Sequence, residues 1–123
     1  MIIGIGTDII EIERIEEAIK KNKRFLDKLF TKDENILFEK KSMRPEVIAG
    51  NFAAKEAISK ALGTGIRGFS FKDIEVLRNE LGKPIAKLNE NIESIVGVKA
   101  YKLNVSISHN NTNAIAFAVL EKI

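Results

Sequence analysis

Asp8 ends a short apolar stretch, "GIGTD", in a setting that could present a carboxylate for chemistry. In an extended strand, Gly4 and Gly6 share one face with Asp8. Two glycines on one face usually mean that another group approaches closely, which favours Asp8 as a site residue. The alternative is that Asp8 caps the next helix, with Glu11 completing a capping box. The stretch lacks the third glycine of a dinucleotide-binding fingerprint, so that type of site is excluded.

Glu56 and Lys60 lie one turn apart in the alanine-rich segment "FAAKEAISKALGTGIRG". On a helix they are separated by about 40° and share a side with Ala49 and Ala53, opposite the larger apolar residues. Such a pair is ordinarily a surface ion pair contributing about 0.3–0.5 kcal/mol. The small neighbours favour another interpretation, in which both charges face an open approach.

The glycines at 63–68 match the spacing of a phosphate-binding loop, but they follow a helix instead of opening one. We therefore expect Gly63 to end the helix in a left-handed conformation. His109 is the single histidine and lies at the tip of a predicted strand. Alone, it is more typical of a solvated turn than of a catalyst.

Together these residues supply two carboxylates and a lysine, in a chain without cysteine. Oxygen ligands without thiolates favour Mg²⁺ over zinc. Mg²⁺ held by one or two carboxylates commonly completes its shell with water and phosphate oxygens, and a nearby lysine can stabilise a leaving phosphate. The residues by themselves therefore indicate phosphoryl-type transfer and no more.

The elements that position these residues are those of one α+β domain spanning residues 1–123, with a small antiparallel sheet packed on helices. Apolar periodicity, the Thr31–Glu34 capping-box spacing and Pro45 predict the helices, and alternation around turn residues predicts two hairpins. The expected strands are 2–8, 73–78, 84–88, 101–108 and 114–121, and the expected helices are 11–21, 24–30, 31–41, 45–62 and 89–97.

Composition is that of a soluble globular protein, with 45% hydrophobic and 30% charged residues. No apolar run approaches the roughly 18 residues of a membrane span, and the apolar start lacks the features of a signal peptide. We expect a cytoplasmic protein that does not bind membranes.

Basic residues cluster at 20–44, a segment that contains nine lysines and arginines but only four acidic residues, although the net charge of the chain is only +3. The simple interpretation is a solvated helix whose charges suit its dipole. The other is a docking face for nucleic acid or an acidic protein.

Three segments carry a family resemblance: "GIGTDIIEIERI" at 4–15, "FAAKEAISKALGTGI" at 52–66 and "SISHN" at 106–110. They resemble the three signatures of the bacterial holo-(acyl-carrier-protein) synthases, the short single-domain 4′-phosphopantetheinyl transferases. The resemblance implies transfer of 4′-phosphopantetheine from coenzyme A to a serine of apo acyl carrier protein, releasing adenosine 3′,5′-bisphosphate and supporting fatty acid biosynthesis. It also implies homotrimers with active sites between subunits.

The resemblance assigns roles to the residues above. Asp8 and Glu56 match the Mg²⁺ ligands, and Lys60 matches the lysine that contacts the phosphates and supports the leaving group. His109 matches the histidine near the coenzyme, with the coenzyme site completed by Gly63, Gly65 and Ser108. Either a metal-bound water or a carboxylate of the site would take the serine proton.

The same resemblance places the carrier protein on the first helix. By match, its electrostatic contacts are Arg14, Arg24 and Lys21, and its apolar contacts are Ile15, Phe25 and Phe52. Acyl carrier proteins are small and acidic, which gives the basic segment a function.

The chain departs from the family at Asn51, where many members have arginine. If that arginine serves the coenzyme, we expect weaker affinity here or a substitute such as Arg44. The alternative function is a non-catalytic basic module that binds RNA or an acidic protein. With one tyrosine and no tryptophan, the chain lacks the aromatics that interleave with basic residues in RNA-binding surfaces, so nucleic acid is not expected as a partner.

Overall fold

The structure of the chain is a computed structural model that describes residues 1–63, 69–96 and 100–123. It is an α+β fold of five strands and five helices in the described part of the chain, plus one 3₁₀ turn, η1. In order, the elements are β1 (Ile2–Glu11), α1 (Ile12–Lys21), α2 (Phe25–Leu29), α3 (Lys32–Lys40), α4 (Pro45–Ala61), η1 (Phe71–Asp73), β2 (Ile74–Arg78), β3 (Pro84–Leu88), α5 (Glu90–Val96), β4 (Tyr101–His109) and β5 (Asn113–Lys122).

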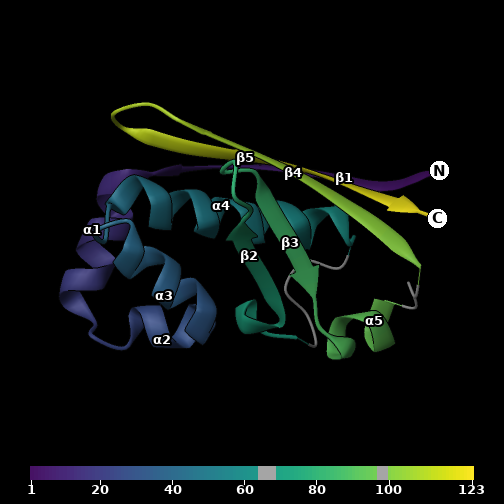
Figure 1. The fold of residues 1–123 in the computed structure, drawn as a ribbon, viewed down its shortest axis with the longest axis horizontal. Helices are drawn as coiled ribbons and strands as arrows, with labels where there is room; N and C mark the ends of the chain where they lie inside the picture. Colours follow the sequence, from purple (N-terminus) through teal and green to yellow (C-terminus); the bar gives the residue numbers. More distant parts are fainter. Residues whose placement is uncertain (64–68, 97–99) are drawn as a thin grey trace.

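The main sheet has three antiparallel strands in the order β1-β5-β4, and α4 runs along one of its faces (Figure 1). Asp8 on β1 lies opposite Ala116 on β5, which in turn lies opposite Ile107 on β4. β1 continues past the predicted end at residue 8 because Ile9 to Glu11 pair with residues 113–115. The sheet therefore carries Asp8 in mid-strand.

The glycines of β1 let α4 lie directly against the sheet. A Cβ atom added to Gly6 would collide with the carbonyl oxygen of Ala57, and one added to Gly4 with that of Ala61. The group predicted to approach these glycines is thus the backbone of α4. Ala49 and Ala53 are fully buried, so they belong to the core and do not keep an approach open beside Glu56, as the sequence suggested.

The helices α1, α2 and α3 gather at one end of the molecule, around a second core cluster that includes Phe30, Phe38 and Ile48 (Figure 1). α3 begins with the predicted capping box, in which Thr31 accepts from the Glu34 amide and Glu34 accepts from the Thr31 amide. The β2–β3 hairpin forms a separate two-stranded sheet. α5 lies at the other end.

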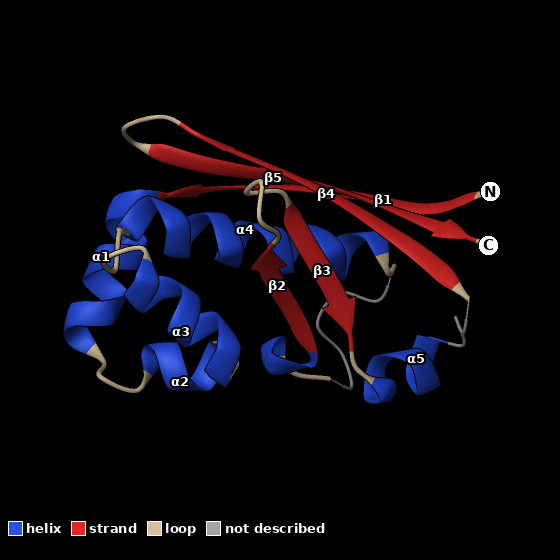
Figure 2. Ribbon diagram, viewed as in Figure 1, coloured by secondary structure: helices blue, strands red, loops and turns tan. Residues whose placement is uncertain are grey.

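The outer face of the three-stranded sheet carries an exposed apolar patch on β1 and β5, whereas β4 presents polar residues such as Ser106 and Ser108 there. Its side chains alternate with those that pack on α4, and none of the described elements covers them (Figure 2). The exposed apolar residues of this outer sheet face are Ile3, Ile5, Ile9, Ile115 and Phe117. Within the described ranges, no helix is long and apolar enough to cross a membrane.

Candidate active site

The close packing of β1 on α4 brings three predicted site residues to one cleft. Asp8 from β1 and Glu56 and Lys60 from α4 line a cleft of about 480 Å³. Arg14, Phe52 and Asn113 line it too. Asn113 was not predicted, because no local motif singles it out and only the β1–β5 pairing brings it to the cleft, opposite Glu11.

Lys60 pairs with β1, not with its helical neighbour Glu56. Its ammonium group donates to the Thr7 carbonyl at 2.9 Å and lies 3.5 Å from Asp8 Oδ1. The simple interpretation of Glu56 and Lys60 as a surface ion pair is therefore wrong. Asp8 does not cap the next helix either, because the N-cap of α1 is Glu11 and it makes no side-chain cap bond.

Glu56 occupies an electrostatically strained position. Burial raises the pKa of its carboxyl group, the negative charge of Asp8 raises it further, and Lys60 opposes both. Two carboxylates that repel each other in a cleft form a favourable place for a cation.

The donor set of this cleft suits Mg²⁺. Asp8 and Glu56 offer hard carboxylate oxygens only. Across residues 1–63, 69–96 and 100–123, no cluster of three or more His, Cys, Asp or Glu side chains could hold a metal. A site with two protein ligands leaves the remaining octahedral positions to water and substrate oxygens, as is usual for Mg²⁺ with phosphate substrates.

His109 lies apart from this cleft within one chain. His109 pairs with Ala114 at the end of β4, and β5 separates β4 from the β1 strand that carries Asp8. It is not among the residues that line the cleft. Ser108 points to the opposite, outer face of the sheet. One chain therefore does not bring Ser108 and His109 to the cleft.

The glycines after α4 behave as a helix end. Gly63 has φ of +81° and its amide donates to the Lys60 carbonyl, as expected of a left-handed terminator. Gly65, the other glycine expected near the coenzyme, lies outside the described residues.

The apolar residues predicted to dock the carrier lie beside the cleft, except for Ile15. Phe25 and Phe52 stack with ring centroids 6.5 Å apart. They line a second, apolar hollow of about 470 Å³, to which Lys28, Leu29, Glu56, Ser70 and Phe71 also contribute. Ile15 is only 2% exposed, so it supports this surface from beneath and is not one of its contacts.

The exposed basic residues of the docking prediction, Arg14, Lys21 and Arg24, lie on or next to α1. Of these, Arg14 also lines the carboxylate cleft. Phe52 and Glu56 line both the cleft and the apolar hollow, so the two cavities meet at α4.

Asn51 does not face either cavity. Its side chain is fully buried, and its amide donates to the Val76 carbonyl at 2.8 Å and to Glu34 at 3.4 Å. Asn51 is therefore a core residue in this structure, and the weaker coenzyme affinity expected from it stays a prediction.

Comparison with known proteins agrees with this geometry. Residues 4–118 match the model of the 4′-phosphopantetheinyl transferase superfamily. The chain belongs to this superfamily. It is 59% identical over 123 residues to the holo-(acyl-carrier-protein) synthase of Clostridium beijerinckii, covering 100% of both chains.

Solved structures of this enzyme class share the fold. The holo-(acyl-carrier-protein) synthase of Neisseria meningitidis matches with a TM-score of 0.88 and 36% identity, covering 99% of this chain and 100% of that one. The Helicobacter pylori enzyme, solved in complex with coenzyme A, matches with a TM-score of 0.85 and 36% identity, covering 95% and 99%. The predicted family, α+β fold, enzyme class and phosphopantetheine transfer are therefore confirmed.

Proposed function

We propose that this holo-(acyl-carrier-protein) synthase carries out its transfer in the cleft between β1 and α4, with Asp8 and Glu56 as Mg²⁺ ligands. The observation that carries the proposal is the convergence of Asp8, Glu56 and Lys60, from segments some fifty residues apart, in one cleft. When bound there, Mg²⁺ neutralises the coenzyme A pyrophosphate and orients it for attack.

The protein residues then divide the remaining work. The Lys60 ammonium, already held at the cleft by the Thr7 carbonyl, faces the phosphate that leaves with adenosine 3′,5′-bisphosphate and stabilises its growing charge. The serine hydroxyl of the carrier attacks the other phosphorus atom in line, the bond from that phosphorus to the leaving phosphate breaks, and the serine proton passes to a carboxylate of the site or to water.

The acyl carrier protein docks on the surface formed by α1, α2 and Phe52. Arg14, Lys21 and Arg24 attract its acidic side chains, and the stacked pair of Phe25 and Phe52 provides the apolar contact. Because Arg14 and Phe52 also line the cleft, a carrier docked here has its serine next to Glu56.

The enzyme is a homotrimer whose subunits meet through the outer sheet face. Single exposed apolar residues are common on protein surfaces, but five on one face form a patch of the kind that marks an interface. This favours burial of the patch against another copy of the chain. Since Ser108 and His109 lie away from Asp8 in their own chain, they serve the coenzyme bound at a neighbour's cleft, together with Arg44. The trimer acts in the cytoplasm.

The test is mass spectrometry of apo acyl carrier protein incubated with the enzyme, coenzyme A and Mg²⁺. We expect the carrier to gain one phosphopantetheine group, and chelation of Mg²⁺ to abolish the gain. Asp8→Asn should lower the rate by about 10²-fold or more, because it removes a metal ligand while keeping the size of the side chain. Asp33→Asn, on the exposed first turn of α3, is the matched control and should keep the wild-type rate. Equal rates for both variants would remove Asp8 from the metal site.

A further inference from the structure

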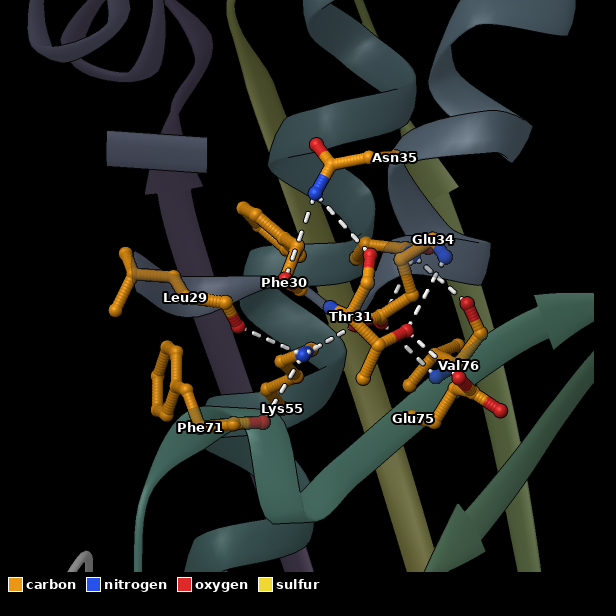
Figure 3. Close-up of polar contacts among 10 residues, drawn as sticks. Leu29, Phe30, Thr31, Glu34, Asn35, Lys55, Phe71, Glu75 and Val76 are labelled. Atoms are coloured by element: carbon orange, nitrogen blue, oxygen red, sulfur yellow. Dashed lines mark hydrogen bonds and ion pairs between the residues drawn. The ribbon is translucent and has the colours of Figure 1, made fainter. Parts of the chain in front are cut away.

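Lys55 is a fully buried lysine that the transfer chemistry leaves unexplained. It precedes Glu56 on α4 and has no exposed side-chain surface. Its ammonium group donates to Glu34 Oε1 at 2.6 Å, to the Leu29 carbonyl at 2.9 Å and to the Phe71 carbonyl at 3.0 Å (Figure 3). All three ammonium hydrogens are therefore used, on three different elements.

Glu34 extends this arrangement to the β2 strand. Its Oε2 accepts from the Val76 amide at 3.0 Å, while its Oε1 accepts from the Thr31 amide at 2.9 Å within the capping box. Asn51 adds the bond to the Val76 carbonyl. The Lys55–Glu34 network thus ties α2, α3, η1 and β2 to α4.

The two carbonyl groups that Lys55 holds belong to residues that line the apolar hollow beside Glu56. Leu29 contributes to it from the end of α2, together with Phe25 and Lys28, and Phe71 contributes from η1, together with Ser70. Phe52 and Glu56 contribute from α4 itself. Lys55 therefore lies behind the hollow and sets the positions of both side walls relative to α4.

A buried ion pair is an expensive way to stabilise a fold, because well-packed apolar residues of similar volume often do as well or better. What an apolar residue lacks is the ability to hold two backbone carbonyls at fixed directions. The geometry of Lys55 is thus better suited to fixing positions than to adding stability.

We propose that Lys55 is a positioning residue of the transfer reaction, which holds the docking side of the hollow in register with Glu56. The inference deepens the proposed function, since it rests on carrier docking at α1, α2 and Phe52. A carrier seated on Phe25 is positioned by α2, and α2 is positioned by the bond from Lys55 to Leu29. Loss of this bond misplaces the incoming serine, whereas Asp8, Glu56 and Lys60 stay in place through the β1–α4 packing.

The test replaces both charges together, as Lys55→Met with Glu34→Gln, so that no unpaired charge stays buried. We expect kcat/KM for the apo carrier to fall by about 10- to 100-fold, since a displacement of about 1 Å can cost that much. The Kd of coenzyme A with Mg²⁺, measured by calorimetry, should stay within about twofold of the wild-type value, because the residues of the cleft are untouched.

Ile92→Ala is the stability control, because Ile92 is fully buried in α5, away from the hollow. It should lower Tm yet keep the wild-type kcat/KM at temperatures where it is folded. If the double variant does not fold, Lys55→Gln with Glu34→Gln replaces it. That pair retains an amide group with two N–H donors at position 55, so a smaller loss of carrier kcat/KM is expected, again with an unchanged coenzyme Kd.

Two results overturn the inference: carrier kinetics within twofold of the wild type in the folded variant, or a coenzyme Kd that rises in parallel with the kinetic loss. Arg14→Glu, measured beside it, tests the docking face separately. If Arg14→Glu leaves the carrier KM unchanged while the Lys55 variant shows the split, the contact through Arg14 is wrong, whereas docking on Phe25 and its positioning by Lys55 stand.

Discussion

Gly6 is where the fold and the candidate metal site depend on each other most directly. The carbonyl oxygen of Ala57 lies so close to Gly6 that α4 would have to retreat by about 1 Å before a methyl group at position 6 reached 3.0 Å, the shortest distance that real Cβ contacts keep. Asp8 is two residues along β1 from this contact, and Glu56 immediately precedes Ala57. The substitution Gly6→Ala therefore separates the two carboxylates at the point where they converge.

We expect Gly6→Ala to cost about 1–3 kcal/mol of folding free energy through this forced backbone shift, a fall in Tm of the order of 10 °C. Among molecules that remain folded, kcat/KM should fall by about 10²-fold, because the displacement is about 1 Å at the proposed metal ligands. Scanning calorimetry measures the first effect, and carrier modification well below the Tm of the variant measures the second.

Gly50→Ala is the matched control. Its new methyl group would meet only the Cγ2 of Ile107, at 2.9 Å, and that side chain can move. Alanine also gains about 1 kcal/mol of helix propensity over glycine, which offsets the contact. Gly50→Ala should therefore keep wild-type stability and activity. If Gly6→Ala behaves like Gly50→Ala in both assays, the close packing of β1 on α4 does not position the site.

Two further predictions concern charge and assembly. Without Mg²⁺, the Tm of Glu56→Gln should equal that of the wild type at about pH 4 and exceed it at about pH 7.5. The pKa of Glu56 is raised in the folded state, so the wild type loses stability as the pH rises through that pKa. The loss should be no more than about 1 kcal/mol, because solvent screens this half-buried group. A difference in Tm that does not change with pH would contradict this. Phe117→Asp should convert the proposed trimer to monomers in light scattering, because it would bury a charge in the proposed contact through the outer sheet face. Leu81→Asp, at the exposed hairpin, should leave the mass unchanged. A trimeric Phe117→Asp would place the subunit contact elsewhere.

Most of the fold could be predicted because each element has a local signal. The capping box at Thr31, Pro45 at the first position of α4 and Gly63 after its end all have the predicted roles. The error at β1 is instructive. Its last three residues are held as a strand only by pairing with β5, which is more than one hundred residues away in sequence, so no local pattern could reveal it.

The site was predicted less completely, because burial depends on packing. Helical periodicity correctly places Ala49 and Ala53 on the same side of α4 as Glu56. It does not reveal whether that side of the helix contacts solvent or packs on a glycine-lined strand, and both alanines are in fact buried. The same limit applies to Ile15, which the family match assigned to the docking surface and which is buried. Lys55 did leave a signal, a charged residue between alanines in a segment otherwise suited to a core.

The single helix α4 explains why these features belong together. Glu56 and Lys60 point into the cleft, Ala57 and Ala61 receive the glycines of β1, and Lys55 holds the walls of the apolar hollow. Successive residues at 100° steps reach all of these surroundings within about two turns of the helix. Between residues 55 and 61 only Lys60 is exposed, so most substitutions there change a buried contact. Substitutions at the Gly6–Ala57 contact should impair catalytic geometry, and substitutions at Lys55 should impair carrier docking. The two effects should be separable, because the two contacts lie on different sides of the same helical turn.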